Sequence, residues 1–174
     1  MSGRRGNALP DLAWLDPGFA IGSKPYAPQR DAIVACGIRT VVTLEQPSDG
    51  EEFDWTRRGV RFVALPTTDW IAIPAARFDR AVAVIGKHRA AGHTVLLHCL
   101  AGQNRAPTVA AAVLCHASGA SVDDALATIR RVRLISAPTD EQEKSLRRWF
   151  DLRCRGGIAP ETIPGGAVSG HCRR

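Results

Sequence analysis

The stretch TVLLHCLAGQNRAPT, residues 94–108, holds the end of a strand, a short loop and the start of a helix. Residues 94–98 are apolar or β-branched up to His98, as in a strand that is covered on both faces. Pro107 then opens an almost wholly apolar segment, residues 107–118. Proline is favoured in the first turn of a helix, so we predict a buried strand that leads through a tight loop into a central, buried helix.

Similar apolar runs lie upstream, and helical patterns separate them. Further strands are predicted at residues 18–21, 39–44 and 61–65, and helices at residues 29–36, 51–58, 76–91, 121–132 and 139–153. Short strands that alternate with helices are typical of a parallel sheet. We therefore predict an α/β fold with a mainly parallel central sheet of about four or five strands, flanked by helices, and a helical C-terminal half.

Length and composition indicate one domain. The chain has 174 residues, of which 45% are hydrophobic and 23% charged, which suits a single core. Both ends lack periodicity, and the last twenty residues are rich in glycine and proline. We predict a flexible N-terminus at residues 1–8, a folded catalytic domain at residues 9–153 and a flexible Gly/Pro-rich tail at residues 154–174.

The charge and the cysteines narrow the possible partners. The formal net charge is +6, but basic and acidic residues are interspersed, so a solvated surface explains them better than a nucleic-acid site. No apolar run approaches the roughly 20 residues that span a bilayer, and a cytoplasmic protein without a membrane partner is expected.

Five cysteines without a C-x-x-C pair argue against a disulfide framework or a structural zinc site. We expect no metal and no cofactor.

The loop after residue 98 has the composition of an anion-binding turn. It follows the carboxyl end of a predicted strand, where ligands of open α/β sheets bind. Backbone N–H groups and the positive end of the next helix attract an anion there. Gly102 permits a tight curve, and Arg105 offers a planar fork that matches two phosphate oxygens. The same field favours the thiolate of Cys99, a nucleophile that could attack phosphorus and form a phosphocysteine.

The pattern His98-Cys99-x-x-Gly102-x-x-Arg105 resembles the signature of the cysteine-based protein tyrosine phosphatase superfamily, and the order of elements is similar to its dual-specificity branch. The resemblance is close over residues 94–108 and loose over residues 9–152. It implies that Cys99 attacks phosphorus and that His98 supports the loop. It also implies a phosphate-binding set made of Leu100, Ala101, Gly102, Gln103, Asn104 and Arg105.

The resemblance further implies a general acid on a separate loop, some thirty residues before the cysteine. Asp69 lies 30 positions before Cys99, after a predicted strand, and Pro66 and Pro74 bracket its segment. Asp79 falls within a predicted helix and is worse placed. The alternative is that Asp69 only forms a turn, as loop aspartates often do.

Three features depart from the family or remain open. The family usually has Ser or Thr after the arginine, where this chain has Ala106, so we expect slow hydrolysis of the phosphoenzyme. Thr108 could supply a substitute hydroxyl, but it lies two residues further round the helix and is expected to point away from the cysteine. Gln142 resembles a water-positioning glutamine, yet Thr139-x-x-Gln142 also reads as a capping box, which we favour. The Arg130-Arg131-x-Arg133 cluster is a weak indication of an acidic substrate.

These observations predict a cysteine-dependent phosphatase that hydrolyses phosphomonoesters through a phosphocysteine. Its partner would be a phosphorylated protein, carrying phosphotyrosine and/or phosphoserine/threonine, or another phosphomonoester. The alternatives are a phosphate-binding pseudophosphatase, an RNA 5′-triphosphatase and a phosphoinositide phosphatase. The sequence leaves the physiological substrate and the oligomeric state open.

Overall fold

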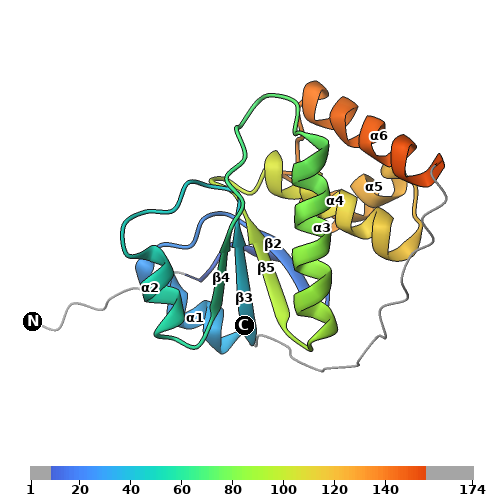
Figure 1. Cartoon of the computed structure of the whole chain (residues 1–174). Helices are drawn as coiled ribbons and strands as arrows, with labels where there is room; N and C mark the ends of the chain where they lie inside the picture. Colours follow the sequence, from blue (N-terminus) through green and yellow to red (C-terminus); the bar gives the residue numbers. More distant parts are fainter. Residues whose placement is uncertain (1–8, 156–174) are drawn as a thin grey trace, which may run out of the picture.

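A computed structural model describes residues 9–155 as one central sheet with helices on both sides (Figure 1). The strands are β1 (Leu12–Asp16), β2 (Phe19–Gly22), β3 (Ile38–Thr43), β4 (Arg61–Ala64) and β5 (Thr94–His98). The helices are the 3₁₀ turn η1 (Ala27–Gln29), α1 (Arg30–Ala35), α2 (Glu51–Thr56), α3 (Ala75–Ala90), α4 (Arg105–Ser118), α5 (Val122–Val132) and α6 (Asp140–Arg155). The predicted α/β fold is confirmed.

The strands follow the order β1-β2-β5-β3-β4. β1 pairs with β2 in the antiparallel sense, and β2, β5, β3 and β4 pair in parallel. β5 therefore lies at the centre, with its carboxyl end beside those of β2 and β3. The loop that begins at Cys99 leaves the sheet from this edge.

The two faces of β5 build two cores, because successive side chains of a strand point to opposite faces. Val95 and Leu97 belong to a large cluster with α3, α4, α5 and α6, and Leu96 belongs to a smaller one that contains Trp55 of α2 and Ile33 of α1. Figure 1 shows α3 to α6 together on one side of the sheet and α1 and α2 on the other. The strand is buried on both faces, as its continuous apolar character predicts.

Some boundaries differ from the sequence-based expectation. The sequence pattern missed β1, an edge strand that is mostly half-buried and therefore lacks a clear hydrophobic alternation. The central helix α4 begins at Arg105, two residues before the proline, and α6 continues to Arg155, two residues past the predicted domain end. The predicted N-terminus at residues 1–8 and all but the first two residues of the predicted tail at residues 154–174 lie outside the described residues. Within residues 9–155, no helix is both long enough and apolar enough to cross a bilayer.

Candidate active site

The carbonyl groups of residues 99–104 all accept hydrogen bonds, at distances between 2.6 and 3.3 Å. The donors are, in order, the His98 ring, the Lys24 amide, the Arg133 guanidinium for two successive carbonyls, the Ala137 amide, and both the amide and the hydroxyl of Thr108. Every described peptide bond is trans, so the N–H that follows each carbonyl points the opposite way. The N–H groups of residues 100–105 are therefore directed toward the inside of the loop, which is the arrangement of an anion-binding nest.

Arg133 is the residue that holds this loop from behind. Its guanidinium is 4% exposed and donates to the carbonyls of Gly102 at 2.6 Å and Ala101 at 3.1 Å. The same group pairs with both carboxylate oxygens of Asp11, at 2.9 and 2.7 Å. Arg130 and Arg131 of the predicted cluster are exposed, whereas Arg133 is buried and binds the loop backbone. Arg133 is therefore not available to an acidic substrate.

Gly102 is required at its position for two reasons. Its φ of +65° lies in the left-handed region, which disfavours residues with a Cβ. A Cβ would also lie 2.4 Å from the Arg133 guanidinium and 2.6 Å from the backbone of Gly22. The prediction that glycine lets the loop curve tightly is confirmed, and the close approach of β2 and Arg133 adds a second constraint.

Arg105, the first residue of α4, is 5% exposed and its guanidinium binds four groups. One terminal nitrogen donates to the carbonyls of Thr67 at 2.9 Å and Leu44 at 3.3 Å. The other lies 3.0 Å from Oδ2 of Asp69 and also pairs with the Glu45 carboxylate. The arginine is therefore locked at the carboxyl edge of the sheet, directly after the Cys99 loop.

The carboxylate of Asp69 lies at the same place, and its two oxygens have different partners. Oδ2 faces Arg105, and Oδ1 accepts from the Trp70 amide at 2.9 Å and from Nε2 of Gln142 at 3.4 Å. Trp70 is the single described non-glycine residue with a positive φ, +66°. Such a conformation is costly for a residue with a Cβ, and here it brings the amide onto the aspartate. Asp69 thus forms a turn and also reaches the signature arginine.

Gln142 forms the capping box that the sequence favours, and it also contacts Asp69. Its backbone N–H donates to the Thr139 hydroxyl at 3.2 Å, and its side-chain Oε1 accepts from the Thr139 backbone N–H at 3.2 Å, so the capping box of α6 is present. Its Nε2 donates to Asp69. The helix cap consequently holds the aspartate loop, which is also tied to α6 by the hydrogen bond from the Ile73 amide to the Ser145 hydroxyl at 3.1 Å.

His98 supports the loop from inside the core. It is fully buried, and Nδ1 lies 3.3 Å from the Cys99 carbonyl oxygen. Burial lowers the pKa of His98 to about 4, and the hydrogen bond to the Cys99 carbonyl opposes this shift. The imidazole is therefore neutral at neutral pH and donates from Nδ1 to the carbonyl.

This burial predicts a pH-dependent loss of stability. Between the ordinary pKa of 6.5 and the folded value of about 4, the unfolded chain binds a proton that the folded chain does not. The free energy of unfolding should therefore fall by roughly 3 kcal/mol as the pH drops through this window. Urea unfolding of the wild type and of His98→Asn between pH 7 and pH 4.5 measures the effect. Exposed His116→Asn is the control, and equal pH slopes in all three proteins would contradict the prediction.

Ala106 and Thr108 occupy the positions where the family pattern departs. Ala106 is fully buried and carries no hydroxyl. The Thr108 hydroxyl donates to the Asn104 carbonyl at 2.7 Å, so its proton is already used within the helix. The expectation that Thr108 points elsewhere is confirmed.

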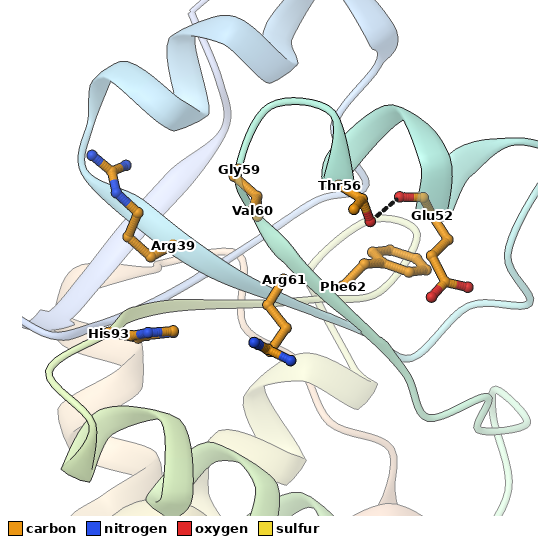
Figure 2. Close-up of a pocket in the computed structure, with 8 residues that line it drawn as sticks. All are labelled: Arg39, Glu52, Thr56, Gly59, Val60, Arg61, Phe62 and His93. Atoms are coloured by element: carbon orange, nitrogen blue, oxygen red, sulfur yellow. Dashed lines mark hydrogen bonds between the residues drawn. The ribbon is translucent and has the colours of Figure 1, made fainter.

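A separate pocket of about 490 Å³ lies at the other end of the parallel strands, near their amino ends (Figure 2). It is lined by Arg39 and Arg61, near the amino ends of β3 and β4, and by His93, which precedes β5. The Cys99 loop leaves the carboxyl end of β5. This pocket is therefore not the site that contains the signature residues.

Sequence reasoning did not identify Glu45, Arg133 or Asp11 as members of the site. Glu45 follows the predicted strand of residues 39–44, so its place at the carboxyl edge was a usable signal. Arg133 and Asp11 gave no such signal, because they lie 122 positions apart. Their pairing depends on how α5 packs beside β1.

Comparison with known proteins agrees with this geometry. The family "PTP-SAK: Swiss Army Knife protein, DSP-PTPase phosphatase domain" matches residues 10–147. The chain is 32% identical over 113 residues to "Dual specificity protein phosphatase Mpk3" of Drosophila melanogaster, covering 63% of this chain and 26% of that protein. It is 27% identical over 126 residues to human "Phosphatidylglycerophosphatase and protein-tyrosine phosphatase 1", covering 68% and 63%. The chain thus spans about a quarter and somewhat less than two thirds of these relatives.

Solved structures support the same fold. The crystal structure of Tk-PTP in the active form has a TM-score of 0.75 and 29% identity, and the match covers 82% of this chain and 97% of that one. PTPMT1 in complex with PI(5)P has a TM-score of 0.75 at 22% identity, covering 84% and 99%. At this identity the second likeness concerns the fold alone.

Proposed function

We propose that this chain, which belongs to the DSP-PTPase phosphatase family, is a cysteine-dependent phosphatase of phosphorylated proteins. The observation that carries the proposal is the nest of N–H groups after Cys99, closed by the buried Arg105 and faced by Asp69. The Cys99 loop, which carries both the nucleophile and the anion cradle, meets an acid from a second segment at the carboxyl ends of the strands. This arrangement meets the requirements of phosphoryl transfer through a covalent intermediate.

The reaction has two displacements. The Cys99 thiolate attacks phosphorus, the bond from phosphorus to the ester oxygen breaks, and Asp69 gives its proton to the leaving oxygen. A water molecule then attacks the phosphocysteine, Asp69 takes the proton of the water, and the thiolate leaves with the release of inorganic phosphate. The loop N–H groups and Arg105 stabilise the charge on the three phosphoryl oxygens in both steps.

The contact between Arg105 and Asp69 makes the Asp69 carboxylate a competitor of the phosphoryl group for the guanidinium. A bound dianion competes with the Asp69 carboxylate for the guanidinium, which is shared between Asp69 and Glu45. Binding would release Oδ2 of Asp69 from Arg105, while Glu45 keeps the arginine in place. The cradle and the acid would thus be assembled together on substrate binding.

Ala106 predicts that the phosphocysteine accumulates, because no hydroxyl at this position assists the departing thiolate. A burst of product followed by a slow steady rate is expected with p-nitrophenyl phosphate, together with a phosphorylated Cys99 peptide in acid-quenched samples analysed by mass spectrometry. Ala106→Ser should raise the steady rate by about tenfold or more, the worth of one hydrogen bond to a charged group.

Ala110→Ser is the matched control, since Ala110 is equally buried one turn further along α4. It should leave the steady rate unchanged. Linear turnover without a trapped phosphocysteine would contradict the proposed rate-limiting step.

A second candidate substrate is a phospholipid monoester. The name of the human relative includes a lipid phosphatase activity as well as a protein one. The same nest and the same nucleophile would serve either ester. What surrounds the site, and not the phosphate chemistry itself, must distinguish the two substrates.

A further inference from the structure

Five exposed apolar side chains lie on the segments that surround the candidate active site. They are between 49% and 90% exposed and make up half of the ten exposed large hydrophobic residues described in the chain. We call these five residues the apolar collar: Trp70, Ile71, Leu100, Leu134 and Ile135. Single exposed apolar side chains are ordinary, but a group that comes from several loops marks a binding surface.

Contacts of neighbouring residues place each part of the collar. Leu100 follows Cys99 directly. Trp70 and Ile71 follow Asp69, whose carboxylate touches Arg105. Leu134 and Ile135 lie between Arg133, which binds the Ala101 and Gly102 carbonyls, and Ala137, whose amide donates to the Gln103 carbonyl at 2.8 Å. The phosphate-binding loop and two segments that contact it thus carry exposed apolar side chains.

Charges of both signs lie near the collar, with Arg130 and Arg131 in the last turn of α5 before Leu134 and an acidic turn of α6 after Ile135. The first turn of α6 carries Asp140, Glu141 and Glu143, and Gln142 of the same turn contacts Asp69. Glu141 pairs with Lys144 and Glu143 with Arg130, and Asp140 has no ion pair with any residue that the structure describes. An anionic bilayer or an acidic peptide would be repelled by this turn. An uncharged, apolar surface would not be.

We infer that the collar binds apolar side chains on either side of the phosphorylated residue of a protein substrate. This inference rests on the proposed function and specifies its substrate class. The nest binds the phosphoryl group, which is the same in every phosphoprotein. The collar contacts the flanking residues, and it therefore selects among substrates by their sequence.

The test compares two phosphotyrosine peptides of equal length, one with leucine and isoleucine around the phosphotyrosine and one with aspartate and glutamate. Leu134→Ser/Ile135→Ser should lower kcat/KM for the apolar peptide by roughly tenfold to a hundredfold, mainly through KM, since burial of such side chains is lost. Turnover of p-nitrophenyl phosphate should stay unchanged. Leu152→Ser, an exposed leucine near the C-terminal end of α6, is the matched control.

Equal kcat/KM of the wild type for the two peptides, or equal losses on both in the double variant, would overturn the inference. A collar-dependent rate with phosphatidylcholine vesicles that contain phosphatidic acid, but not with either peptide, would also overturn it and assign the collar to a lipid. Binding of both labelled peptides to Cys99→Ser gives the same comparison without turnover. The collar inference can therefore fail while p-nitrophenyl phosphate is still hydrolysed, and the proposed function fails separately if Cys99-dependent hydrolysis is absent.

Discussion

Replacement of Cys99 by serine is expected to reduce turnover of p-nitrophenyl phosphate on the order of 10⁴-fold or more, as when the nucleophile of a covalent mechanism is removed. The hydroxyl has nearly the size of the thiol, so the loop and its hydrogen bonds should persist. A hydroxyl is a much weaker acid and a weaker nucleophile than a thiol, so serine cannot attack phosphorus at a comparable rate. Initial rates at mildly acidic pH measure the loss.

Cys115→Ala is the control for this experiment, because Cys115 is a buried cysteine of α4 outside the Cys99 loop. The control should retain most of the activity. Calorimetric binding of inorganic phosphate to Cys99→Ser should also be retained, which separates a lost nucleophile from a lost cradle. Turnover by Cys99→Ser within tenfold of the wild type would rule out the phosphocysteine mechanism.

Arg105→Lys is expected to lower kcat/KM for p-nitrophenyl phosphate on the order of 10³-fold, as for removal of a preorganised donor to a developing oxyanion. Lysine keeps the positive charge but loses the planar fork that can bind two oxygens at once. It also cannot satisfy the Leu44 and Thr67 carbonyls while it contacts Glu45 and Asp69. The measurement is the steady-state rate combined with the urea midpoint, so that unfolding is accounted for.

Glu45→Gln gives the companion measurement. It removes the charge that anchors Arg105 but leaves a hydrogen-bond acceptor, and a loss of roughly tenfold is expected, in line with one weakened charge-assisted hydrogen bond. Arg105→Lys with nearly full activity would show that the guanidinium does not bind the phosphoryl group. A Glu45→Gln loss as large as that of Arg105→Lys would assign Glu45 a direct part in the chemistry.

The elements that local patterns determine were predictable from the sequence. The run of residues 94–98 gave the bounds of β5 without error, and the run of residues 39–44 gave β3 to within one residue. The helix predicted at residues 121–132 is α5, and the Ser121 hydroxyl caps it by accepting from the Asp124 amide at 3.1 Å. β1 escaped detection because an edge strand that is half-buried has no strong periodicity.

The sequence by itself predicted the strand, the loop of residues 99–104 and the arginine that follows, and the resemblance to the phosphatase family pointed to the aspartate thirty positions earlier. These features depend on neighbouring residues and on the rule that strand ends of a parallel sheet share an edge. Only the tertiary structure decided that Arg133 and Asp11 hold the loop, that Glu45 anchors Arg105, and that Gln142 both caps α6 and contacts Asp69. The physical reason is that these contacts join segments far apart in the chain, whose meeting depends on how helices pack against the sheet.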